Sequence, residues 1–171
     1  CKEPVLGNFN QNKTISIQAD ASQSGLGATL MQEGKPIYYA SKALTDTEKT
    51  YSQIEKELLA IVYACNKFHY YIYGRHVTIT TDHKPLLSII KKEVCQVISP
   101  RLQRMKLKLI KYNITLEYKC GKEMFIADLL SRNFSKEPVS DDNELNETIH
   151  SIEKHLNISD AKRLEFENAI E

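Results

Sequence analysis

Three strand patterns precede the first helix pattern in this chain, and that order restricts it to folds whose sheet begins as an antiparallel meander. Residues 14–20 alternate with period two, so their apolar side chains share one face and Asp20, at the end, points to the other. Residues 26–32 lead into the turn at residues 33–35, where glycine supplies the unusual backbone angles. Residues 36–41 then return as the third strand.

The elements that follow complete a mixed α/β order. A capping box at residues 45–48 predicts a helix start, and one long helix with apolar steps of three and four is expected to end at Gly74. Gly25 and Gly27 predict a close backbone approach near the start of the second strand. Later elements are expected at strand 77–81, short helix 85–90, helix 101–111, strand 114–118 and short helix 125–132. The order β-β-β-α-β-α-α-β-α predicts an α/β fold with a five-stranded mixed sheet, its first three strands antiparallel, flanked by helices.

Four carboxylates occupy positions that are costly without a positive partner. Asp20 and Asp82 each end a strand pattern. Glu57 interrupts the apolar face of the long helix, between Ile54 and Ile61. Asp128 lies in the last short helix. Burying such charges without compensation is unfavourable.

Each acid also has an ordinary structural explanation. Glu57 could pack its stem at the core boundary while its carboxylate reaches water, and aspartates commonly follow strands at turns. Asp128 could cap a helix or face solvent. The combination is harder to explain in this way, because neighbouring parallel strands would bring like charges together. A pair of divalent cations placed to cut a phosphodiester would account for all four acids at once.

The charge distribution indicates a polyanion as partner. The net charge of the 171 residues is only +1, but residues 135–171 carry −6 and residues 1–134 carry +7. Residues 91–122 hold nine basic side chains against two acids. In the helix at 101–111, four basic side chains lie opposite the apolar ones: Arg101, Arg104, Lys108 and Lys111. Such a face is usually just solvated, yet the scarcity of acids favours contact with phosphates.

The remaining composition narrows the class of protein. Four cysteines without a C-x-x-C pair argue against a zinc site or a disulfide framework, and for a reducing compartment. No run approaches the ~18 apolar residues of a membrane span, so no membrane partner is expected. Because the chain begins at Cys1 rather than Met, we expect it to be a piece of a longer polypeptide.

Several motifs occur together in one unbroken order. Asp20-Ala21-Ser22 precedes Gly25-Leu26-Gly27-Ala28, and Tyr39-Ala40-Ser41-Lys42-Ala43-Leu44 follows. The later motifs are Glu55-Lys56-Glu57-Leu58-Leu59-Ala60, Thr81-Asp82-His83-Lys84-Pro85-Leu86 and Ala127-Asp128-Leu129-Leu130-Ser131-Arg132. Over residues 4–134 the chain resembles the ribonuclease H domain of gypsy-type LTR retrotransposon polyproteins. The resemblance implies a ribonuclease H-like fold.

The resemblance also implies a site. The family's catalytic acids fall on Asp20, Glu57, Asp82 and Asp128, which would hold two Mg²⁺ ions, with Mn²⁺ as a substitute. The histidine that cellular and retroviral ribonucleases H carry before the last aspartate is missing; Tyr118 nearby could assist product release or serve only as a strand aromatic. Substrate contacts are expected from these residues: Ser22, His83, Lys84, Arg101, Arg104, Tyr118 and Arg132.

By this resemblance the chain is a two-metal endonuclease that hydrolyses the RNA strand of RNA·DNA hybrids. Residues 1–12 would end a reverse transcriptase connection segment, 13–134 form the ribonuclease H domain, and 135–171 form an acidic linker and helical tail. The partners would be an upstream polymerase domain and a downstream integrase, in a cytoplasmic virus-like particle or the nucleus.

The same sequence features allow two alternative functions. One alternative is a catalytically inactive nucleic-acid-binding or scaffolding domain of a domesticated element, although no acid is missing. The other is a transposase or proofreading exonuclease of the same fold. A transposase places its Glu last, and an exonuclease requires Asp-x-Glu on the first strand, so the order of acids here disfavours both.

Overall fold

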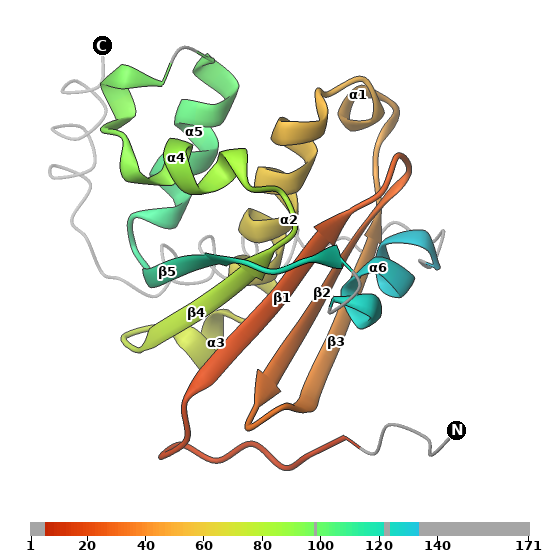
Figure 1. Ribbon diagram of the computed structural model, residues 1–171, viewed down its shortest axis with the longest axis vertical. Helices are drawn as coiled ribbons and strands as arrows, with labels where there is room; N and C mark the ends of the chain where they lie inside the picture. The colour runs from red at the N-terminus through yellow and green to blue at the C-terminus, as the bar shows by residue number, and fades with distance from the viewer. Residues whose placement is uncertain (1–5, 98, 122–123, 134–171) are drawn as a thin grey trace, which may run out of the picture. The chain divides into compact units, whose positions relative to one another are not determined.

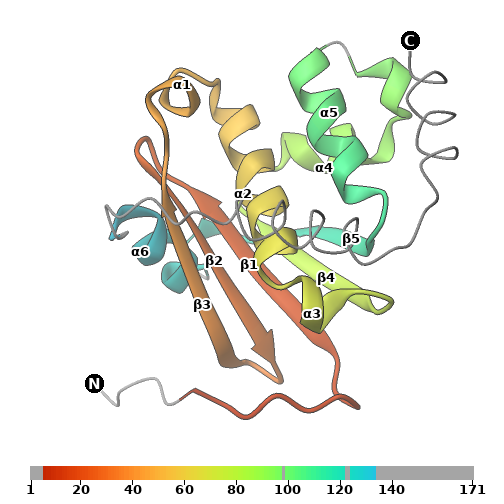
Figure 2. The same cartoon turned by 180° about the vertical axis from the view of Figure 1, so that it is seen from behind.

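A five-stranded sheet with the strand order β3-β2-β1-β4-β5 forms the centre of the computed structural model, which describes residues 6–97, 99–121 and 124–133. Helix α2 packs on one face of β1 and β2, and α6 packs on the other face of the same strands (Figures 1 and 2). The chain divides into units 1–138 and 139–171. The tail predicted at 135–171 lies outside the described residues, and the proposed domain boundaries remain predictions.

The first three strands form the predicted meander. β1 (Ile15–Ala21) pairs antiparallel with β2 (Gly25–Gln32), which pairs antiparallel with β3 (Lys35–Ala43). The turn between β2 and β3 has positive φ at Glu33 (49°) and Gly34 (75°), as a two-residue hairpin of primed type requires. The antiparallel start of the sheet is confirmed.

The other half of the sheet is parallel. β4 (His76–Thr81) lies beside β1, and β5 (Asn113–Tyr118) lies beside β4. Gln18 is opposite Thr80 in the β1–β4 register. Residues two positions further along each strand, Asp20 and Asp82, therefore reach the same edge of the sheet.

The prediction of a single long helix up to Gly74 is wrong. Three helices occupy the stretch: α1 (Asp46–Lys49), α2 (Gln53–Lys67) and α3 (His69–Ile72). The predicted capping box at Thr45 is present, but the helix that begins there is only one turn long. Ser52 then takes extended angles (φ −62°, ψ 157°) and starts α2, with its N–H donating to Glu55 at 3.0 Å. Phe68, fully buried, separates α2 from α3.

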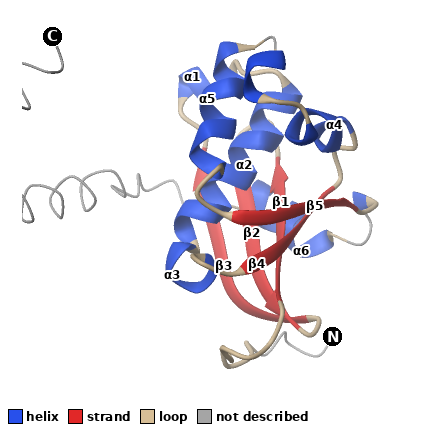
Figure 3. Cartoon of the chain, turned by 90° about the vertical axis from the view of Figure 1, so that its left-hand side faces the viewer, coloured by secondary structure: helices blue, strands red, loops and turns tan. Residues whose placement is uncertain are grey.

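The remaining α-helices follow the predicted positions: α4 (Pro85–Lys91), α5 (Pro100–Leu109) and α6 (Phe125–Arg132). The 3₁₀ turn η1 (Val94–Gln96) is an addition that the sequence did not predict. α5 buries Leu102, Met105 and Leu109, as its apolar stripe predicts. Figure 3 shows α2 and α5 on one side of the sheet. No helix in the described part of the chain has the length and apolar character that crossing a membrane demands.

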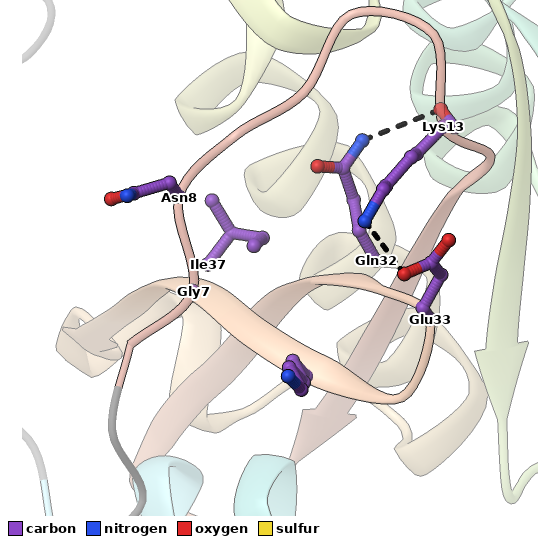
Figure 4. A pocket seen from close by; sticks show the side chains of 7 residues that line it. Gly7, Asn8, Lys13, Gln32, Glu33 and Ile37 are labelled. Atoms are coloured by element: carbon purple, nitrogen blue, oxygen red, sulfur yellow. Dashed lines mark hydrogen bonds and ion pairs between the residues drawn. The ribbon is translucent and has the colours of Figure 1, made fainter.

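The segment before β1 is tied to the β2–β3 hairpin. The buried Gln32 side chain accepts from the Asn10 N–H at 2.9 Å and donates to the Asn10 carbonyl at 2.8 Å. Figure 4 shows Gln32 beside Lys13, whose ammonium pairs with Glu33 at 2.7 Å. Gly7 N–H donates to the Pro36 carbonyl at 2.8 Å. These bonds attach residues 7–13 to the sheet, although the predicted ribonuclease H domain begins only at residue 13.

Helix α6 sits directly on the backbone of β2 at Gly27. A Cβ atom at this position would lie 2.5 Å from the Ser131 backbone nitrogen and 2.9 Å from Leu130 Cβ. It would also collide with the Ala127 carbonyl oxygen. Only glycine permits this approach, which bears out the close contact predicted from the sequence.

Replacing Gly27 with alanine should push α6 off the sheet. Overpacking of this kind lowers the free energy of unfolding by about 1–3 kcal/mol, which urea denaturation would measure. Amide hydrogen exchange should show lost protection in α6 while α2 keeps its protection. Gln23→Ala, an exposed change in the β1–β2 turn, is the matched control. Unchanged protection of α6 in the Gly27 variant would contradict the direct contact.

Candidate metal centre

Three carboxylates meet at the carboxyl ends of the neighbouring strands β1 and β4. Asp20 comes from β1, Asp82 follows β4 directly, and Glu57 reaches the same place from α2. One oxygen from each lies within 4.8 Å of the others. The parallel register explains the approach of the two aspartates, because it carries both strands to one edge.

Asp20 is held from the opposite face of the sheet. Its side chain is buried, and its Oδ2 accepts a hydrogen bond from the Ser131 hydroxyl of α6 at 2.7 Å. Burial raises the pKa of Asp20 above its ordinary value, and the Ser131 bond acts against that rise. The charges of Asp82 and Asp128 raise the pKa further. The carboxylate is thus placed where its own charge is unfavourable.

Among the described acids, Glu57 has the most strongly shifted pKa. Only 3% of it is exposed, and its Oε1 accepts from the Gln53 side-chain amide at 2.6 Å. Its Oε2 is buried and has no hydrogen-bond partner within the described residues. Burial raises the pKa of Glu57 from 4.5 to about 8, and the charge of Asp20 adds to this effect. A buried carboxylate oxygen without a donor could be satisfied by a bound cation.

Asp20, Asp82 and Asp128 line a pocket of about 390 Å³ that is open to solvent. Its lining residues are Asp20, Asp82, Gly121, Met124, Phe125, Asp128 and Arg132. A Cβ atom on Gly121 would lie 3.1 Å from Asp82 Oδ2. The missing side chain therefore keeps space beside this carboxylate.

Asp128 lines the same pocket but lies outside the group of three. Its Oδ1 accepts from Arg132 Nε at 2.8 Å, and Nη2 of the same guanidinium lies 2.7 Å away. Both side chains are substantially exposed, so this i,i+4 ion pair adds little to stability. Asp20, Asp82 and Asp128 thus line one pocket. Glu57 joins the first two in the cluster, and Asp128 is paired with an arginine.

The cluster fits a divalent cation. Carboxylate oxygens are the ligands that Mg²⁺ prefers, and three of them converge here with one oxygen of Glu57 left unpaired. No basic side chain contacts Asp20 or Glu57 in the hydrogen bonds and ion pairs of the described residues. The charge of Arg132 lowers the pKa of Asp20 without outweighing its burial. A cation would supply the contacting positive partner that these two buried acids do not find among the described residues.

The predicted substrate residues fall into two groups. The side chains of Ser22, Arg101 and Arg132 are engaged within the protein, Arg132 with Asp128. The Ser22 hydroxyl donates to the Ser131 carbonyl at 2.6 Å. Arg101 binds both oxygens of Glu55 at 3.0 Å and stacks over Tyr51, with its guanidinium carbon 4.0 Å from the ring centre. These bonds join the helix α5 to the start of α2.

The other predicted contacts are more open. Arg104 is exposed on α5, and Lys84 is exposed at the start of α4. Tyr118 is 46% exposed at the end of β5, and His83 is partly buried just after Asp82. Within the basic run, Lys106 instead donates to the Ile89 carbonyl at 3.1 Å and is buried. Contact of any of these residues with a substrate remains a prediction.

Two residues that orient the acids were not predicted. Gln53 lies four residues before Glu57, a spacing at which helical side chains meet. Ser131 lies three residues after Asp128, on the same helix. The first spacing could have been noticed in the sequence, whereas the approach of Ser131 to Asp20 depends on the packing of α6.

Comparison with known proteins identifies the family. The model of the "RNase H-like domain found in reverse transcriptase" matches residues 10–112, which include Asp20, Glu57 and Asp82 but not Asp128. The Pol polyprotein of transposon 297 of Drosophila melanogaster is 38% identical over 165 residues, covering 91% of this chain and 15% of the polyprotein. That of transposon gypsy, from the same organism, is 38% identical over 167 residues, covering 91% and 16%. The chain thus spans about one sixth of these relatives.

Solved structures show the same fold. The foamy viral protease-reverse transcriptase in complex with an RNA/DNA hybrid aligns with a TM-score of 0.56 at 22% identity, over 67% of this chain and 16% of that one. LC11-RNase H1, also in complex with an RNA/DNA hybrid, aligns with a TM-score of 0.56 at 14% identity, over 68% and 93%. The resemblance noted in the sequence is confirmed: the chain belongs to the family of RNase H-like domains found in reverse transcriptase.

Proposed function

We propose that this domain is a metal-dependent endonuclease that hydrolyses the RNA strand of RNA·DNA hybrids. The supporting observation is the cluster of Asp20, Glu57 and Asp82, whose oxygens converge within 4.8 Å beside an open pocket that Asp20 and Asp82 line. Two of these carboxylates are buried without a basic partner, and one buried oxygen of Glu57 has no donor within the described residues. Such an arrangement is costly for stability alone, and marks a functional site.

Asp20, Glu57 and Asp82 would hold Mg²⁺ or Mn²⁺, with Asp128 as a further ligand from the pocket wall. When bound, such cations supply an activated water for in-line attack and stabilise the leaving 3′-oxygen. Of the protein's own groups, Ser131 and Gln53 orient the two buried carboxylates. Arg132 neutralises Asp128 until a ligand competes for it.

Binding of the hybrid would come from the basic face of α5. Arg104 and Lys108 are exposed there, and Lys111 is exposed just beyond the end of the helix. Phosphate contacts of this kind are independent of sequence and weaken with salt. Discrimination of RNA from DNA would come from the shape of the groove and the 2′-hydroxyls. Two structurally similar reverse transcriptase and RNase H1 chains were solved with an RNA/DNA hybrid.

The chain would act as one part of a Pol polyprotein. Because it covers only 15% and 16% of the transposon 297 and gypsy polyproteins, a polymerase domain upstream and an integrase downstream are proposed partners. The proposed setting is the cytoplasmic virus-like particle, with entry into the nucleus as the alternative.

Loss of one carboxylate of the cluster should abolish cleavage. With Mg²⁺ and a labelled RNA·DNA hybrid, Asp82→Asn is expected to lower kcat/KM by on the order of 100-fold or more, because a lost metal ligand forfeits several kcal/mol of transition-state stabilisation. Asp46→Asn makes the same chemical change on a fully exposed side chain of α1 and should leave cleavage unaltered. Equal activity of the Asp82 variant and wild type would refute the assignment. Tight hybrid binding without any cleavage by wild type would support the inactive nucleic-acid-binding alternative.

The stability of the metal-free protein should depend on the protonation of Glu57. Its pKa is about 8 in the folded state against 4.5 ordinarily, so the folded state binds this proton more tightly. The resulting stability is fully present below pH 4.5 and is lost as pH rises to about 8. The slope is at most about 1.4 kcal/mol per pH unit.

Urea denaturation from pH 5 to 8.5 in EDTA would measure this dependence. Glu57→Gln, which carries no charge at any pH, should reduce the slope and be more stable than wild type at pH 8. Asp46→Asn, on the surface, serves again as the control. If the Glu57 variant kept the wild-type slope, another group would be responsible.

Arg104 should contact phosphate directly, since no hydrogen bond or ion pair of the described residues engages its side chain. Arg104→Ala is expected to weaken hybrid binding and to reduce the slope of log Kd against log salt by about 1. Fluorescence anisotropy between 50 and 300 mM salt, without divalent cations, measures both. Lys35→Ala, an exposed basic change on the β2–β3 turn, is the control. An unchanged salt slope for Arg104→Ala would place the hybrid elsewhere.

A further inference from the structure

We propose that Ser131 is a positioning residue for metal binding: its hydroxyl, delivered by α6, holds the Asp20 carboxylate in the orientation that the cation requires. This inference rests on the proposed function, and it assigns a role to a residue that touches neither substrate nor cation.

The geometry of Ser131 supports this role. The residue is 0% exposed, and its Oγ lies 2.7 Å from Asp20 Oδ2. Oγ also lies 2.9 Å from the Asp128 carbonyl, the usual acceptor for a helical serine. The ionised carboxylate is the stronger acceptor, so the single hydroxyl proton is directed to Asp20.

Independent contacts fix the position of Ser131. The Ser22 hydroxyl donates to the Ser131 carbonyl at 2.6 Å, and the Ser131 backbone nitrogen lies against Gly27. The hydroxyl of Ser131 is therefore placed by the docking of α6 on β1 and β2. It cannot follow the carboxylate if that side chain rotates, so it restrains Asp20.

The same pattern occurs at the second buried acid. The Gln53 side-chain amide donates to Oε1 of Glu57 at 2.6 Å, and Oε2 has no donor within the described residues. In both cases a neutral donor binds one oxygen, which orients the carboxylate without neutralising it. Asp128, at the exposed wall of the pocket, is instead paired with the charged Arg132. Neutral donors are the type of partner that orients a metal ligand without displacing the cation.

The test compares Mn²⁺ binding, measured by isothermal titration calorimetry and by electron paramagnetic resonance of free Mn²⁺, in four proteins of 171 residues. These are wild type, Ser131→Ala, Ser131→Cys and Thr80→Val. Ser131→Cys fills the buried space with a weak donor, so it tests the hydrogen bond even if the alanine variant does not fold. Thr80→Val removes a buried hydroxyl of β4 that donates to the Ile17 carbonyl and touches no carboxylate, and is the matched control.

Both Ser131 variants are expected to bind Mn²⁺ about 10- to 100-fold more weakly than wild type, whereas Thr80→Val should lose stability but keep wild-type affinity. Wild-type affinity in a folded Ser131 variant would overturn the proposal and leave Ser131 a packing residue. Equal weakening in Thr80→Val would also overturn it, because a general loss of stability would then be the cause. Absence of Mn²⁺ binding to wild type would instead overturn the metal centre itself.

Discussion

The parallel pairing of β1 with β4 is the constraint on which the site depends. Its register brings Asp20 and Asp82 to one edge of the sheet, although 62 positions separate them in the numbering. Two like charges at such short range oppose folding, and the burial of Glu57 beside them raises its pKa to about 8. The fold must therefore supply the stability that this cluster removes, and the apolar packing of α2 on β1 and β2 is the main source available.

Two helices on opposite faces of the sheet then hold the acids in place. α2 supplies Glu57 together with Gln53, and α6 supplies Asp128 together with Ser131. The start of α2 is itself braced by Arg101, which binds Glu55 and stacks on Tyr51. Because each carboxylate is fixed through backbone packing, the separation of the acids depends on the sheet and helices rather than on loops.

The sequence predicted the sheet and the four acids because their signals are local. Period-two alternation, the turn at Gly34 and a carboxylate on an apolar helix face are all visible within a few residues. The break at Ser52 was missed because the capping box at Thr45 and the apolar stripe of α2 are each valid helix signals, and nothing nearby shows that they belong to separate helices. The Ser131–Asp20 bond spans 111 positions and depends on the approach of α6 to Gly27, so no local pattern reveals it. The predicted basic contacts have different outcomes for the same reason. Only the fold shows that Arg101 already pairs with Glu55.

The exposed cations of α5 and the carboxylates of the pocket together favour the proposed nuclease over a domain that only binds nucleic acid. A polyanion is attracted by the exposed cations of α5, but the pocket itself presents carboxylates and would repel a phosphate. A protein that only bound nucleic acid would gain affinity by replacing those acids, and would gain stability as well. Retaining all four, with two of them buried beside neutral donors, is physically reasonable when cations fill the pocket and reverse its sign. Burial and the charge of Asp20 raise the pKa of Glu57, and a cation bound beside it would favour the ionised form.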